Sequence, residues 1–273
     1  MSAKIQHYRD KYGYSLILLR QLVISDFKLR YQGSALGYLW SLLRPLALFL
    51  TLYVIFVKFI GLGAGIPAYP VYLLLGVVLW NFFTEVTNGS IGSIVGKGDL
   101  LRKINFPKYV IVLSGSFSAL INLFLNLLVV FIFALFAKVD ISTGIIFVPL
   151  LIAELFIFAL GIGFFLSAAF VRFRDITFIW EVFMQGAFYA TPILYPLSEK
   201  YIPLKYAKLL ILNPVAQVIQ DFRYVSISPI TETINTLYGS HLFRLIPIGA
   251  VLFTAMIAAI YFRKRSKYFA EEV

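Results

Sequence analysis

The chain has 273 residues, of which 60% are hydrophobic and only 14% are charged. A soluble domain is about half apolar or less, so this composition predicts a protein whose solvent is lipid and leaves no soluble domain of useful size. The net charge is +11, and the basic residues flank apolar runs instead of forming one stripe, which argues against nucleic-acid binding. The chain has no cysteine and only two histidines, which excludes a disulfide, a thiolate site and a histidine-based metal site.

The N-terminal segment, residues 1–31, is basic and amphipathic. Its apolar positions recur at helical spacing and are Leu16, Leu19, Val23 and Phe27. Its charged positions fall between them and include Arg20, Asp26, Lys28 and Arg30. We predict a helix that lies in the cytoplasmic interface of the membrane. The alternative is an ordinary basic helix that only sets topology.

The join to the first apolar run is the stretch RYQGSALGYLWSLLRP at 30–45. Its small residues, which predict a tight hairpin, are Gly33, Ser34 and Gly37. Tyr38 and Trp40 follow where a membrane interface favours aromatic side chains. Arg44 then lies at a depth that bulk lipid disfavours. This arginine either faces protein or water inside the membrane, or extends back to the headgroups.

Six apolar runs are long enough for membrane helices, which need roughly 20 residues. They cover residues 38–60, 69–88, 109–137, 144–171, 176–196 and 244–262. The fifth run contains Thr191 and Pro192 and ends at Pro196, so we expect a kink or a break there. The predicted fold is an all-α integral membrane protein with six transmembrane helices.

Lysine and arginine sort the connections onto two sides. Basic residues gather in the N-terminal segment, the loop after the second run, the turn after the fourth and the tail. These four groups fall on one side of a six-span arrangement, whereas the loops at 61–68 and 138–143 carry no net charge. The sequence therefore predicts that both termini are cytoplasmic.

Polar residues inside the apolar runs should face protein or water because lipid penalises them. Besides Arg44 they include three carboxylates, Glu85, Glu154 and Glu181. One helical face of the fifth run carries Phe178, Glu181, Gln185 and Phe188. This face suits a wet path for a cargo with hydroxyls and flat sugar rings, although a seam between helices is the alternative.

The third run carries small polar residues four positions apart, for which the seam between helices is the stronger interpretation. They are Ser114, Ser118, Asn122 and Asn126. Some aromatic residues could line a sugar path together with the fifth run. They are Tyr38, Trp40, Tyr53, Trp80 and Phe83, and each by itself is more often a packing residue.

The loop after the second run contains no nucleotide-binding motif. Its segment GSIVGKGD at 92–99 lacks the four-residue gap between glycines, and Gly98 stands where a phosphate loop needs Ser or Thr. The chain should therefore obtain its energy from a partner. A short amphipathic helix with Ile91, Ile94 and Val95 could dock into that partner, and a plain interfacial loop is the alternative.

Four segments resemble the membrane permease subunits of ABC-2-type polysaccharide exporters, which carry O-antigen, capsular polysaccharide or teichoic acid. They are RYQGSALGYLWSLLRPL at 30–46, LLRKINFPKYVIVLS at 100–114, YATPILYP at 189–196 and LNPVAQVIQDFR at 212–223. With the six-span layout they cover nearly the whole chain. Arg44 stands where this family is expected to have an uncharged polar residue, so the resemblance assigns it no role, and Glu85 and Glu154 receive none either.

The resemblance implies a single domain of residues 1–273 that forms a homodimer with two ABC ATPase subunits beneath it. Residues 89–103 would be a coupling helix with contacts from Ile94, Val95, Asp99, Leu100, Leu101 and Arg102. Residues 197–225 would be re-entrant gate helices on the outer side, with Pro196, Asn213, Pro214 and Arg223 at the gate. The entrance hairpin would be formed by Arg30, Tyr31, Gly33, Ser34 and Gly37. The substrate channel would be lined by Tyr38, Trp40, Tyr53, Trp80, Phe83, Phe178, Glu181, Gln185 and Phe188.

The predicted function is export of a lipid-linked polysaccharide, with O-antigen favoured, across the bacterial inner membrane. The chain itself would have no catalytic site, metal or cofactor, because ATP and magnesium would bind to the partner ATPase. Teichoic acid or capsular polysaccharide export is the nearest alternative, followed by ABC-2 export of drugs or lipids. An ion-coupled transporter, with protons on Glu85 and Glu181, is the alternative from another class.

Overall fold

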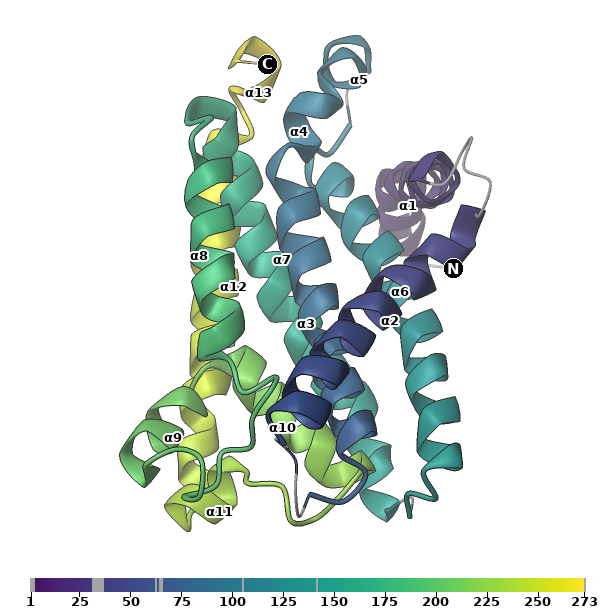
Figure 1. Cartoon of the computed structure of the whole chain (residues 1–273). Coiled ribbons are helices and arrows are strands. Elements are labelled where there is room, and N and C mark those ends of the chain that lie inside the picture. The colour runs from purple at the N-terminus through teal and green to yellow at the C-terminus, as the bar shows by residue number, and fades with distance from the viewer. Residues whose placement is uncertain are drawn as a thin grey trace.

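The computed structural model describes residues 3–30, 37–61, 63, 66–104, 106–140 and 142–272, and every regular element in these ranges is helical. Five helical segments in the described residues are long and apolar enough to cross a membrane (Figure 1). They are α2 with η2 (Trp40–Leu52, Tyr53–Phe59), α3 (Tyr69–Ile91), α6 (Tyr109–Phe136), η3 with α7 (Thr143–Phe147, Val148–Arg172) and η4 with α12 (His241–Arg244, Leu245–Arg265). A helix pairs its backbone N–H and C=O groups internally, and this is required in lipid because lipid offers these groups no hydrogen-bond partners.

These five segments match the predicted first, second, third, fourth and sixth runs within a few residues. The predicted fifth span is shorter in the structure, where the helical part of residues 176–196 is α8 (Ile176–Ala190), a helix of 15 residues. At 1.5 Å per residue this helix is about 22 Å long, less than the ~30 Å hydrocarbon core. The break expected at Thr191 and Pro192 is present, since α8 ends at Ala190 and Thr191 adopts an extended conformation.

The central helix of the bundle is α3, and 78% of its most apolar stretch is buried inside the protein. Helices α6 and α7 pack along it, and α2, α8 and α10 (Pro214–Ser226) add further contacts. Because α3 is apolar on nearly all its faces, it suits a position surrounded by other helices. The remaining spans expose apolar side chains such as Leu128, Leu150 and Leu252 on the outside of the bundle, as lipid contact requires.

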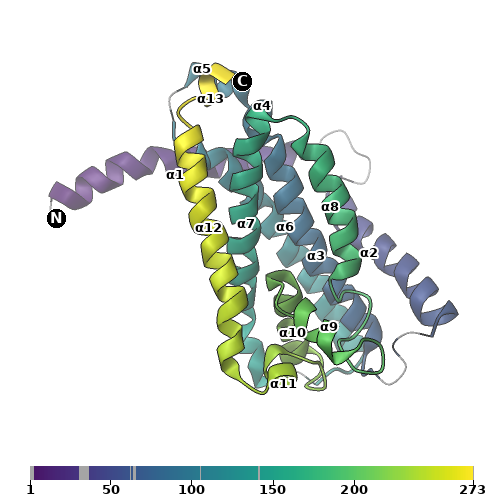
Figure 2. The ribbon, with the colours of Figure 1, turned by 90° about the vertical axis from the view of Figure 1, so that its left-hand side faces the viewer.

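The N-terminal helix α1 (Ala3–Arg30) runs almost perpendicular to the bundle near one end (Figure 2). That direction agrees with the predicted interface helix. Leu18, Leu19 and Leu22 pack toward the bundle, whereas Leu16 is 64% exposed. The helix is turned this way because it packs on α6 and also places Asp26 against the bundle.

The two ends of the bundle carry different short helices (Figure 1). One end has α4 (Ser93–Gly96), α5 (Gly98–Lys103) and α13 (Phe269–Glu272), close to α1. The other end has α9 (Leu204–Leu210), α10 and α11 (Ile234–Tyr238). The predicted coupling and gate segments therefore lie at opposite ends of the molecule.

Candidate functional site

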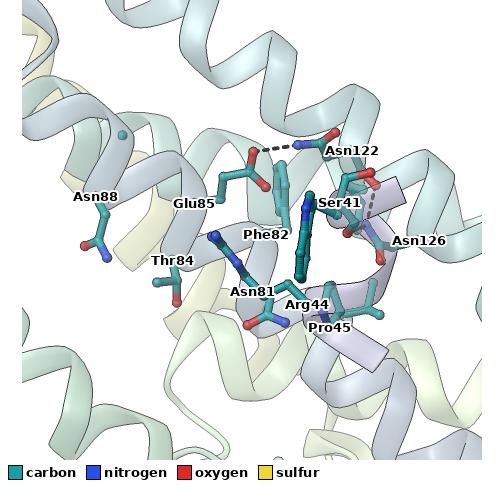
Figure 3. A pocket seen from close by; sticks show the side chains of 14 residues that line it. Ser41, Arg44, Pro45, Asn81, Phe82, Thr84, Glu85, Asn88, Asn122 and Asn126 are labelled. Carbon is teal, nitrogen blue, oxygen red and sulfur yellow. Dashed lines mark hydrogen bonds between the residues drawn. The ribbon is translucent and has the colours of Figure 1, made fainter. Parts of the chain in front are cut away.

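A polar pocket of about 700 Å³ lies between α2, α3 and α6 (Figure 3). Its lining is Trp40, Ser41, Arg44, Pro45, Val78, Asn81, Phe82, Thr84, Glu85, Asn88, Gly89, Asn122, Leu123 and Asn126. Four asparagines, two hydroxyls and two charged residues therefore meet within three apolar helices. The third-run polar stripe supplies two of these asparagines, so part of the predicted seam faces a cavity.

Hydrogen bonds hold the α6 side of this pocket. The Asn122 Nδ2 donates to Glu85 Oε1 at 2.8 Å, which connects α6 to α3. The Asn126 Nδ2 donates to the Ser41 carbonyl oxygen at 3.3 Å, which connects α6 to α2. The predicted interpretation of the stripe as a seam is thus confirmed at these two asparagines, and the same bonds orient them beside the cavity.

Two buried oxygen atoms in the pocket lining have no hydrogen-bond partner in the described part of the chain. They are the Thr84 Oγ1 and the Asn122 Oδ1. Asn122 is only 4% exposed, so bulk water does not reach most of it. Buried polar atoms normally have a partner, but each of these two has almost no exposed surface, so a molecule in the pocket does not reach either atom in this conformation.

Arg44 lies on α2 and lines the same pocket. Its side chain reaches from α2 toward α3, in the direction of Thr84 and Glu85 (Figure 3). No ion pair within the described ranges involves Arg44, and its exposed surface is large. Of the two sequence interpretations, the structure supports an arginine that faces a polar cavity within the protein.

The predicted channel residues do not form one surface of the chain. Trp40 lines the polar pocket and Tyr53 is half-buried. Trp80 and Phe83 are only 5% and 4% exposed because they lie in the core around α3, so their prediction as channel-lining residues is wrong for this chain. Tyr38 lies in η1 (Gly37–Leu39), and its side chain is outside the described part.

The predicted face of α8 is largely open. Phe178 is 68% exposed, and Glu181 and Gln185 are exposed on the same face. Phe188 differs because it is half-buried with its ring 5.8 Å from that of Trp80. Three of the four stripe residues therefore remain available to a second chain or to a transported molecule.

The predicted coupling segment is two short helices, α4 and α5, that meet at Lys97. Ile94 is fully buried and Leu101 is 7% exposed, since both pack in a cluster with α6, α7, α12 and α13. Their prediction as contacts with an ATPase is therefore wrong. Asp99 and Arg102 are exposed, whereas Val95 and Leu100 are half-buried at the edge of the same cluster.

An ion pair that was not predicted connects this segment to α1. The Lys97 Nζ lies 2.9 Å from Asp26 Oδ1, and the Ser114 hydroxyl donates to Asp26 Oδ2 at 3.0 Å. These three residues come from α1, the α4–α5 junction and α6. Each was visible in the sequence as a basic, acidic or seam residue, but their large sequence separation left no signal of the contact.

Arg223, predicted at the gate, is fully buried on α10. Its guanidinium donates to the carbonyl oxygens of Tyr72, Pro192 and Ile193 at 2.7–3.0 Å and lies 3.5 Å from the centre of the Tyr72 ring. It therefore ties α10 to α3 and to the segment after α8. Gly76 is one turn further along α3, and a Cβ there would overlap the Arg223 Nη2.

The remaining gate residues lie at the start of α10 and in the segment that follows α8. The Asn213 Oδ1 accepts from the Val215 N–H at 3.0 Å, and Pro214 begins α10, which is the usual N-terminal arrangement of a helix. Pro196 is half-buried in the segment that follows α8. These positions stabilise the start of α10 and the chain that leads to it.

A cluster of hydrogen-bonded polar side chains along α10 was also not predicted from the sequence. The Gln217 Nε2 donates to Asp221 Oδ2 at 2.7 Å, and Arg244 pairs with Asp221 Oδ1 at 3.0 Å. Burial raises the pKa of Asp221 above its ordinary value, and the Arg244 charge opposes that rise. Glu154 on α7 has one buried oxygen without a partner among the described residues.

The entrance hairpin falls mostly outside the described residues, including Tyr31, Gly33 and Ser34. Arg30 is the last residue of α1. Gly37 has a φ of +49°, a backbone conformation that favours glycine. This single described position is compatible with the predicted turn.

The chain is similar in sequence to known bacterial polysaccharide transport proteins. The chain is 30% identical over 256 residues to an O-antigen export system permease protein RfbA of Klebsiella pneumoniae, covering 89% of this chain and 96% of the relative. It is 29% identical over 272 residues to the RfbA of Myxococcus xanthus, covering 98% and 100%. A polysialic acid transport protein KpsM of Escherichia coli is 24% identical over 214 residues, covering 78% and 82%.

The apolar helices and these bacterial relatives make the chain a multi-pass protein of the bacterial inner membrane. A family model described as ABC-2 type transporter matches residues 17–227, which include α1, the polar pocket, the α4–α5 segment and α10. The chain therefore belongs to the ABC-2 type transporter family.

Proposed function

We propose that this protein is the permease subunit of an ATP-driven exporter of a lipid-linked polysaccharide, with O-antigen as the favoured cargo. The observation that carries the proposal is the alignment with O-antigen export permeases along nearly the full length of both chains. The chain contributes the membrane passage, while a separate ABC ATPase contributes nucleotide chemistry. The more distant polysialic acid transport proteins make capsular polysaccharide the second candidate cargo.

The α4–α5 segment is the proposed contact with the ATPase. Its buried side, Ile94 and Leu101, anchors it on the ends of α6, α7 and α12, so a push on its outer side moves these helices together. Its outer side carries Asp99 and Arg102. The contact is therefore polar, in place of the apolar docking expected from the sequence.

Six crossings remain the proposed topology although α8 is short. Helix α8 begins at the end of the bundle where α7 finishes, and it leads toward the end that carries α9 (Figure 1). The chain at 191–203 then continues to α9 and α10, which act as re-entrant gate helices on the outer side. The basic residues in these connections support a cytoplasmic location for α1, α4 and α5.

The function is tested by depleting the protein in its native cells. Surface polysaccharide should disappear while lipid-linked polymer accumulates on the cytoplasmic side, and both can be measured by immunoblotting of separated fractions. The chemical identity of the accumulated polymer decides between O-antigen and capsule. Unchanged surface polysaccharide after depletion would refute the proposal, and export by the purified chain without an ATPase would favour an ion-coupled transporter.

The ATPase contact is tested by two kinds of variant. Asp99→Lys should lower ATP-driven export about tenfold, because a reversed charge in a docking surface costs on the order of 1–2 kcal/mol, while the unfolding temperature stays unchanged. Leu101→Asp should instead lower the unfolding temperature, because it buries a charge in the cluster. Normal export by Asp99→Lys, measured in vesicles with the ATPase, would contradict the assigned contact.

A further inference from the structure

The polar pocket between α2, α3 and α6 is unusual for its place in the membrane. Arg44 and Glu85 are its charged residues, and each lies about one to two turns inside its membrane helix, where lipid disfavours a charge without a polar partner. The pocket follows α3 from Gly89 to Val78, a length of about 16 Å at 1.5 Å per residue. Such an arrangement is stable in lipid only when water or a polar ligand fills it.

The chemistry of the lining separates into two parts. Arg44 has no ion pair in the described ranges and offers a fork of donors, the geometry that phosphate binds well. Asn81, Glu85 and Asn88 follow one face of α3 in the pocket lining and offer both donors and acceptors. The half-buried Asn81 and the exposed Asn88 match the donor and acceptor character of sugar hydroxyls.

The first membrane span also offers an apolar outer surface next to the pocket. Leu48, Leu50 and Val54 are exposed further along the same helix. A lipid chain can lie against these apolar side chains while its polar head enters the pocket. The volume of about 700 Å³ also falls within the ~300–1,000 Å³ typical of small-molecule sites.

We propose that this pocket binds the phosphate-linked sugar at the lipid end of the exported glycan. Arg44 binds the phosphate, and Asn81, Glu85 and Asn88 bind hydroxyls of the attached sugar. The inference rests on the proposed function, because it takes a lipid-linked glycan as the cargo. It adds a site that holds the headgroup within one permease subunit, beside the start of the first span.

The test measures binding to the permease in complex with its ATPase, in detergent, by microscale thermophoresis. The main probe is farnesyl diphosphate linked to N-acetylglucosamine, and the comparison probes are farnesyl diphosphate and phosphatidylglycerol. Arg44→Gln should weaken both diphosphate probes about tenfold or more, because a charge-assisted hydrogen bond is lost. Asn88→Ala, which removes an exposed amide from the pocket lining, should weaken only the sugar-bearing probe, by about threefold.

Lys58→Gln is the matched control, because Lys58 is a second cation on the same span and lies outside the pocket lining. It should leave all affinities unchanged. Equal binding of the sugar-bearing probe by Arg44→Gln and the wild type would overturn the inference. Equal competition by phosphatidylglycerol would also overturn it, because the pocket would then accept any phospholipid headgroup.

Export by the wild-type complex in vesicles is measured in parallel with the same preparation. If the wild-type complex exports glycan but Arg44→Gln binds the probes as tightly as the wild type, the headgroup site is refuted and the proposed function still stands. Failure of the wild-type complex to move any lipid-linked glycan, with its ATPase active, defeats the proposed function itself. The two failures are therefore distinguishable.

Discussion

Two arginines lie among the apolar helices, and their surroundings give them different roles. Arg223 has three carbonyl oxygens and an aromatic ring around its guanidinium, so its donors are satisfied by protein. Arg44 has no comparable set of partners in the described residues and faces a cavity. A buried charge with complete hydrogen bonding supports the fold, whereas one that faces a cavity is available to a ligand.

At this scale Gly76→Ala should destabilise the protein by on the order of 1–3 kcal/mol, because overpacking displaces a fitted side chain. The added methyl group would overlap the Arg223 Nη2 and move it from the carbonyl oxygens. Gly115→Ala is the control, since Gly115 is in a membrane helix with open space around it. Thermal unfolding in detergent should show a lower midpoint for Gly76→Ala only, and equal midpoints would contradict the proposed role of Arg223.

Among the elements, α1 is more than a helix lying on the membrane. It packs on α6 and is joined to the α4–α5 junction through Asp26, Lys97 and Ser114. The same junction carries the proposed ATPase contact, so movement there reaches the interface helix through one ion pair. The side chains of this pair are about a quarter exposed, which makes it a small contribution to stability but a direct mechanical connection.

We expect Lys97→Met and Asp26→Asn each to reduce ATP-driven export several-fold, because each breaks the connection between α1 and the coupling segment. The exchanged pair Asp26→Lys with Lys97→Asp should recover part of the loss, as a double-mutant cycle requires for a direct interaction. Asp140→Asn removes an exposed carboxylate beyond the far end of α6 and serves as the control. Full activity of Lys97→Met in reconstituted vesicles would show that the ion pair has no part in coupling.

The surface of the molecule at α8 is unsuited to lipid contact. This short helix exposes large apolar residues together with Glu181 and Gln185, a mixture that lipid disfavours. By contrast, α12 exposes the purely apolar surface of Leu252, Phe253 and Met256. A second copy of the chain covering the α8 side would protect its polar groups and would suit the proposed homodimer with a passage between the two subunits.

The dimer surface can be tested because the chain contains no cysteine. Val182→Cys on α8 should give crosslinked dimers with a short bis-maleimide in native membranes, because its side chain is 70% exposed on the side proposed to meet the partner. Leu252→Cys on α12 is similarly exposed, at 62%, and should remain monomeric in the same assay. Crosslinking at Leu252 with none at Val182 would place the subunit contact on the opposite side.

The sequence by itself determined the helical class, the limits of five membrane segments and the position of the break after α8. These features depend on local properties, namely the length of apolar runs, the placement of proline and the distribution of basic residues. The sequence did not indicate that Ile94, Leu101, Trp80 and Phe83 are buried. Periodicity identifies a face, but it does not say which neighbour that face meets.

Only the tertiary structure decided which distant polar groups come together. Asp26 meets Lys97 and Ser114, Arg223 meets the backbone of α3, and the polar faces of α2, α3 and α6 enclose one pocket. In lipid the hydrophobic effect does not choose partners between helices, so close packing and hydrogen bonds set their rotation and neighbours. Those choices depend on shape across the whole bundle, and no short stretch of sequence contains them.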